Sequence, residues 1–298
     1  MRDLVSGKEK AAVIAAAFAL AGATILAAPA AGQAAQSQPA QPKAAAGQTQ
    51  PAGQAQGQAP AQNAAPEQPP VNKEEEDAYK AYYALAPAQM TELISQGEDF
   101  LKKYPGSRYR TSVYSRLVGA YLNTGQKDKM VDAARKAIAE NPDNADVLAL
   151  VSTVIPRTVT DPRALDADQK LSEAEKYAKH AIELVNSMPK PDGITDEQFV
   201  AAKNEKLGLA HYGLGLVYYM RGNPAAYVPE LEQASKLDPQ AEPLLYYLLG
   251  RGDLRLKNYS DATAAFDRCA KAQWDPQWQA RCKSGIEEAK QGAVAPKP

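Results

Sequence analysis

The sequence has few of the residues from which metal sites are usually built. Its 298 residues include two histidines and two cysteines, and none of these lies at the spacing of a metal-binding motif. A structural zinc site needs four such ligands, commonly arranged as two close pairs. We therefore expect no metal ion, no haem and no other cofactor.

Excess charge is also missing, because 34 basic residues are balanced by 35 acidic ones, for a formal net charge of -1. Proteins that bind nucleic acids usually carry a surplus of basic residues. The chain also has no run of acidic residues at its end. We expect its partners to be other proteins, and no nucleic acid.

A complete nucleotide-binding motif is absent too. The stretch from Gly119 to Lys127 is close to a phosphate-binding loop, in which four residues separate two glycines and a lysine follows directly. Here five residues separate Gly119 from Gly125, Gln126 comes before the lysine, and Asp128 replaces the hydroxyl residue that would bind magnesium. The stretch is instead predicted to be the turn between two helices.

Other motifs associated with chemistry are equally weak. Arg251, Gly252 and Asp253 spell a cell-adhesion tripeptide, but they lie in a predicted helix that would hide it. No pairing of a nucleophile with a base is evident, and the acidic clusters are typical of solvated helix faces. We therefore predict that the protein is not an enzyme.

The amino-terminal segment is predicted to direct export. Arg2, Lys8 and Lys10 precede an uncharged, apolar run over residues 11–28, and small residues follow. This is the layout of a secretory signal, although the run is also just long enough to cross a bilayer. Residues 1–34 are thus a cleaved signal peptide or an inner-membrane anchor. Both alternatives predict an exported bacterial protein of the periplasm or cell envelope, and without a nearby cysteine a lipid anchor is excluded.

Large apolar residues are missing from the next segment, residues 35–70. From Pro29 to Pro70 the chain is almost entirely alanine, glutamine, proline and glycine, and Lys43 and Glu67 are its only charges. Such a segment cannot bury enough apolar surface to offset the entropy lost on ordering. We expect a disordered linker, either a simple spacer or a tether that crosses the cell wall.

Residues 71–291 are predicted to form an all-α domain, followed by a disordered tail at 292–298. Apolar residues recur there at intervals of three and four, and no alternating strand pattern of useful length is found. A pair of helices is expected to break near Pro87, an irregular insertion covers Thr158 to Asp168, and an unusually long helix is expected from Asp196 to Met220.

One pattern of large and small residues occurs three times in this domain. A first helix carries leucine beside tyrosine or glycine, and a second carries apolar residues at regular intervals. The matching residues are Leu117, Tyr121, Gly125, Met130, Ala134, Ala137 and Pro142 in the first unit; Leu214, Tyr218, Gly222, Tyr227, Leu231, Ala234 and Pro239 in the second; and Leu249, Gly250, Tyr259, Ala262, Phe266 and Cys269 in the third. The pattern resembles the tetratricopeptide (TPR) repeat, whose period is about 34 residues. A weaker resemblance, carried by "FLKKYPGSRY", is to outer-membrane-assembly lipoproteins with TPR repeats.

The resemblance implies a right-handed solenoid of antiparallel helix pairs with a C-terminal capping helix. In TPR proteins the first helices of the units line a concave groove that binds peptides. Carried over to this sequence, the partner-binding groove would comprise Leu122, Asn123, Tyr212, Leu216, Tyr219, Tyr247, Arg251 and Arg255. Its aromatic residues and arginines would suit a segment with an acidic side. The alternative is that Tyr212 and Tyr247 only pack against neighbouring helices.

The two cysteines form the last candidate feature. Cys269 and Cys282 are expected on consecutive antiparallel helices, on either side of a turn near Asp275. Export would place them in an oxidising compartment, where a disulfide persists. We expect either a disulfide between them or two buried thiols.

Overall fold

The computed structural model describes residues 72–271 and 276–294, and over these residues the protein contains helices and no strand. The helices are α1 (Lys73–Tyr83), α2 (Met90–Lys103), α3 (Arg110–Asn123), α4 (Lys127–Glu140), α5 (Ala145–Thr158), α6 (Ala167–Ser187), α7 (Asp196–Met220), α8 (Pro224–Leu237), α9 (Pro243–Leu256), α10 (Tyr259–Lys271) and α11 (Pro276–Val294). The all-α prediction is confirmed. The predicted signal or anchor (1–34) and linker (35–70) lie outside the described residues.

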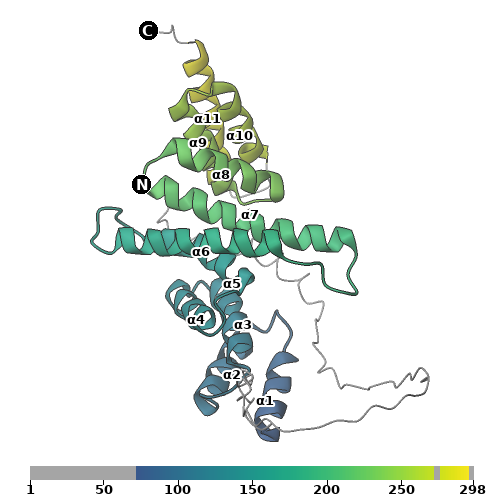
Figure 1. Cartoon of the computed structure of the whole chain (residues 1–298). Helices are drawn as coiled ribbons and strands as arrows, with labels where there is room; N and C mark the ends of the chain where they lie inside the picture. Colours follow the sequence, from purple (N-terminus) through teal and green to yellow (C-terminus); the bar gives the residue numbers. More distant parts are fainter. Residues whose placement is uncertain (1–71, 272–275, 295–298) are drawn as a thin grey trace, which may run out of the picture. The chain divides into compact units, whose positions relative to one another are not determined.

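Successive helices pack as antiparallel pairs (Figure 1). The pairs are α1 with α2, α3 with α4, α5 with α6, α7 with α8, and α9 with α10, while α11 packs against α10 and α9. The predicted repeat architecture with a terminal capping helix is therefore confirmed. The predicted long helix is α7, which has the expected bounds, whereas α11 runs to Val294, past the predicted domain end at residue 291.

Three turns between paired helices contain a residue in the left-handed backbone region. Gly125 and Gly222 have φ angles of 73° and 72°, as expected of glycines that reverse the chain. In the third unit Lys257 occupies the equivalent place after α9, with a φ of 64°. Because Lys257 has a Cβ atom, this left-handed conformation costs free energy in the third turn.

Side-chain caps determine where several helices begin. Asn72, Asn144 and Asn223 each accept a hydrogen bond from a backbone N–H in the first turn of the following helix. Thr195 and Gln198 form a reciprocal capping box at the start of α7. These caps satisfy donors that would otherwise have no partner within the helix.

The buried residues form two main cores that meet at α7. The N-terminal core contains buried residues of α1 to α6 together with Val217 and Met220 of α7. The C-terminal core contains Tyr212 and Leu216 of α7 together with buried residues of α8 to α11. Helix α7, the longest helix described, therefore contributes to both cores and is buried on several faces near its end.

Glycines in α7 and α9 allow the helices of the C-terminal core to approach closely. A Cβ atom at Gly215 would lie 2.3 Å from Leu231 Cδ2, and one at Gly250 would lie 2.8 Å from the ring of Phe266. Even alanine would require these neighbours to move. These glycines therefore let the paired helices pack closely.

Candidate functional site

Three of the predicted groove residues are part of the hydrophobic core. The exposed fraction is 8% for Leu122, 6% for Tyr212 and 1% for Leu216. Their assignment to a partner-binding surface was wrong. At these three positions the side chains are covered by neighbouring helices, so they form packing surface and not groove.

Asn123 is separated from the remaining candidates. It ends α3, beside the N-terminal core, and its Nδ2 donates a hydrogen bond to the carbonyl of Gly119 at 3.0 Å. The residue is half-buried and bonded to its own helix. The structure therefore does not bring Asn123 together with the candidates on α7 and α9.

Three other candidates do gather, around the buried ring of Tyr227. Tyr219 packs edge-on against that ring, with 5.5 Å between centroids. Burial raises the pKa of Tyr227, and the nearby charges of Arg255 and Arg251 act in the opposite direction. We call the surface formed by Tyr219, Arg251 and Arg255 the tyrosine–arginine face; Arg255 is its exposed member, and the other two are partly buried.

Tyr247 and Arg251 also have structural contacts of their own. The ring of Tyr247 lies 5.9 Å from that of Phe266 and 5.6 Å from that of Trp278. Tyr247 thus packs against α10 and α11, as the alternative expectation had it. The guanidinium of Arg251 pairs with Glu288 on α11, so it is less accessible to a partner than Arg255.

The cell-adhesion tripeptide is hidden, as predicted. Gly252 and Asp253 are buried within α9, and Asp253 is only 2% exposed. Asn258 Nδ2 donates to the Asp253 carboxylate at 3.3 Å. Burial raises the pKa of Asp253, and this hydrogen bond lowers it. Burial has the larger effect and, together with the negative charges of Asp261 and Glu232, raises the pKa to about 6.

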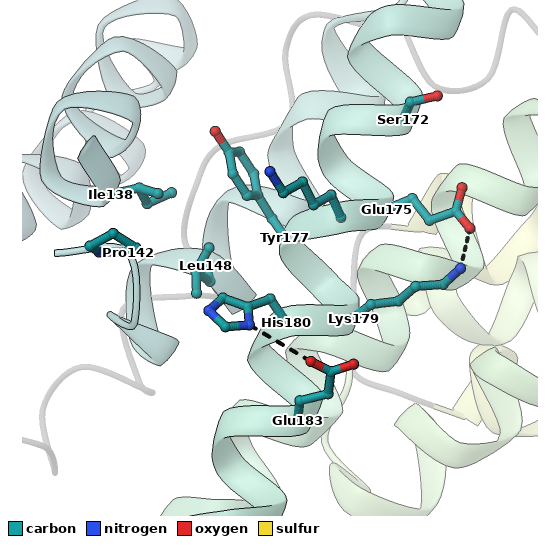
Figure 2. Close-up of a pocket in the computed structure, with 10 residues that line it drawn as sticks. Ile138, Pro142, Leu148, Ser172, Glu175, Tyr177, Lys179, His180 and Glu183 are labelled. Carbon is teal, nitrogen blue, oxygen red and sulfur yellow. Dashed lines mark hydrogen bonds and ion pairs between the residues drawn. The ribbon is translucent and has the colours of Figure 1, made fainter. Parts of the chain in front are cut away.

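A shallow hollow of about 590 Å³ lies between α4, α5 and α6. Figure 2 shows Ile138 and Pro142 facing Tyr177 and His180 of α6, with Leu148 between them. The hollow was not predicted, because it depends on the spacing between α4, α5 and α6 in the folded chain. No motif marks it.

The ionisable groups around the hollow are engaged in structural contacts. Burial would raise the pKa of Glu175, but hydrogen bonds from Lys179, Arg221 and Tyr218 outweigh it and lower this pKa to about 2. His180 lies 2.8 Å from a carboxylate oxygen of Asp143. Glu175 thus ties α6 to α7, and His180 ties α6 to the turn before α5.

Cys269 and Cys282 form a disulfide, with their Cα atoms 5.9 Å apart. Both side chains are fully buried, between α10 and α11. The bond therefore connects the capping helix to the last helix pair.

Two kinds of feature are missing from the part of the chain that the structure describes. Within residues 72–271 and 276–294, no group of three or more histidine, cysteine, aspartate or glutamate side chains could hold a metal ion. Over the same residues, no helix combines the length and the apolar character needed to cross a bilayer.

Similarity to known proteins is confined to solved structures. A thermophilic TPR protein of Thermus thermophilus is 17% identical over 72% of this chain and 99% of its own, with a TM-score of 0.46. A tetratricopeptide repeat protein from Parabacteroides merdae is 11% identical over 74% of this chain and 100% of its own, with a TM-score of 0.27. No protein-family model and no curated protein matches the sequence. The internal repeat and its packing remain the basis for comparing this chain with TPR proteins.

Proposed function

We propose that this protein is a non-enzymatic scaffold that binds other proteins through the tyrosine–arginine face. A stack of helix pairs presents extended surface with few constraints on its composition, which suits binding rather than catalysis. The observation that carries the proposal is that the exposed Arg255 and the half-buried Tyr219 both lie near the buried Tyr227. Tyrosine and arginine are enriched among residues that dominate binding energy.

The partner segment is expected to carry a carboxylate. Arg255 forms no ion pair with any other described residue, so its charge is available, whereas Arg251 is already paired with Glu288. Arginine presents a planar fork of donors that matches a carboxylate, and the ring of Tyr219 provides an apolar surface beside it. An acidic segment with an apolar side chain fits both groups.

Crosslinking in the native cell tests this proposal. A photoreactive amino acid at the position of Tyr219 should capture a specific protein, and the crosslinked peptide should contain aspartate or glutamate. Arg255→Glu should then weaken binding of that purified partner at least about tenfold, because a rim charge is reversed against a like charge. Lys102→Glu is the matched control, since Lys102 is an exposed lysine on α2 without an ion pair among the described residues. Equal binding by both variants would contradict the proposal.

We further propose that the protein acts in the bacterial cell envelope, released as a soluble periplasmic protein after cleavage. The basic start, apolar run and small residues of positions 1–34 support export. The second candidate is a membrane-tethered accessory factor for envelope assembly or secretion, supported by the length of the run over residues 11–28. Amino-terminal sequencing of the exported protein distinguishes them, because an intact Met1 in the membrane fraction identifies the tethered form.

A further inference from the structure

Helix α7 occupies an unusual position, because it belongs to both cores. In the last nine residues of α7, Tyr212 and Leu216 pack in the C-terminal core, while Val217 and Met220 pack in the N-terminal core. Tyr218 and Tyr219 contact both cores from the side. Any change in the angle between the two cores must therefore be accommodated along this helix.

Three polar side chains join the cores across α7. The guanidinium of Arg157, near the end of α5, forms an ion pair with Glu242, the residue before α9. Its Nη2 also donates to the hydroxyl oxygen of Tyr212 at 3.0 Å, and that hydroxyl donates to Glu242 Oε1 at 2.6 Å. We call Arg157, Tyr212 and Glu242 the latch.

The latch links two helices, α5 and α9, that belong to different helix pairs. Helix α5 packs on α4, α6 and α7, and α9 packs on α8, α10 and α11. The contact between Arg157 and Glu242 thus connects two helix pairs that are not neighbours in the stack. Residues 85 positions apart in the sequence are held together by side chains rather than by helix packing.

The latch is also partly withdrawn from water. The exposed fraction of the side chain is 18% for Arg157 and 23% for Glu242, and Tyr212 is 6% exposed as a residue. Removing water strengthens the interaction between the two charges and makes an unpaired charge costly. In some proteins a buried ion pair selects one arrangement rather than adding net stability. A latch between the two cores requires this property.

We propose that α7 is a flexion point between the N-terminal and C-terminal cores, and that the latch of Arg157, Tyr212 and Glu242 sets the angle between them. Opening the latch leaves each core intact and lets the cores rotate about α7. Because Tyr219 contacts both cores, the tyrosine–arginine face then changes its position relative to the N-terminal helices. The latch is defined without reference to any partner, so this inference stands or fails separately from the proposed binding function.

Distance measurement between two spin labels tests the latch. Asp99 on α2 and Ala264 on α10 are both exposed, and each can be replaced with cysteine and labelled, since the native cysteines are buried and bonded to each other. Glu242→Gln removes the negative charge of the latch at nearly constant size. We expect a wider distance distribution with a shifted maximum relative to the doubly labelled protein with an intact latch.

A matched control separates the latch from ion pairs in general. Glu173→Gln breaks the pair in which Arg135 Nε and Nη2 donate to Glu173 at 2.8 and 2.7 Å, which joins α4 to α6 beside the N-terminal core. This variant should leave the distribution unchanged. Tyr212→Phe removes only a hydroxyl, so it keeps the domain folded should Glu242→Gln not fold, and it should widen the distribution to a smaller extent. Unchanged distributions in the folded latch variants, or equal widening by Glu173→Gln, would overturn the proposal.

Discussion

The N-terminal and C-terminal cores are held together by different kinds of contact. At the beginning of the N-terminal core, an arginine on α3 binds the end of α1. The guanidinium of Arg116 donates to the carbonyl oxygens of Tyr82, Tyr83 and Leu85 at 2.8 to 2.9 Å and lies over the rings of both tyrosines. One side chain therefore caps the end of α1 and packs against it.

The C-terminal core relies instead on close helix approach and a covalent bond. Gly250 and Gly285 both face the ring of Phe266, which is fully buried between α9, α10 and α11. The disulfide between Cys269 and Cys282 then joins α10 to α11. A covalent bond therefore secures the carboxyl end, whereas the amino end has a polar cap from one arginine.

Removing the disulfide is expected to lower the free energy of unfolding more than any other change proposed below. In Cys269→Ala with Cys282→Ala, the unfolded chain gains the entropy of an open loop, which for the separation of 13 residues amounts to about 3 kcal/mol. Hydrogen exchange should show the loss mainly in α10 and α11. Exchange in α3 and α4 should hardly change, and a uniform increase over all helices would contradict separate contributions from the two cores.

Arg116→Met tests the other end of the molecule. The substitution keeps an unbranched, apolar side chain but removes the donors for the three carbonyl groups. We expect a loss of about 2 kcal/mol, since hydrogen bonds from a charged donor contribute more than neutral ones. Increased proteolysis or exchange confined to α1 is the diagnostic result. Arg108→Met is the control, because Arg108 is exposed and its guanidinium contacts the ring and hydroxyl of the adjacent Tyr109 rather than the end of α1.

Asp253→Asn makes the C-terminal core less sensitive to pH. The folded protein holds the Asp253 proton up to a pKa of about 6, whereas the unfolded chain releases it near the ordinary value of 3.8. In the parent protein, the stability contributed by this group is therefore full below pH 4 and is lost as pH rises through 6. Asparagine does not titrate, so the variant should be more stable than the parent by roughly 2 kcal/mol at pH 7 and by almost nothing at pH 4. Thermal unfolding at both pH values measures this; an equal difference at both would contradict the assignment to Asp253.

The fold was more predictable than the site for a physical reason. Helix pairing follows from local spacing, so the turns at Gly125 and Gly222 were predicted. Surface exposure depends on how neighbouring pairs cover one another, and this is why Leu216 was assigned to a groove although it is buried. The latch could not be predicted for the same reason, since nothing in the sequence relates Arg157 to Glu242.

The smallest expected effect concerns the turn in which the third repeat departs from the other two. Lys257 has the left-handed conformation that Gly125 and Gly222 adopt without a steric penalty, and its side chain is exposed. Lys257→Gly should therefore stabilise the protein by about 0.5–1 kcal/mol, the relief of strain exceeding the added entropy of the unfolded chain. Lys127→Gly is the control, because Lys127 begins α4 with no such strain and should lose stability. Equilibrium unfolding in denaturant measures both changes in stability. A loss of stability in Lys257→Gly would show that the charge of this lysine at the end of α9 stabilises the protein by more than its backbone strain destabilises it.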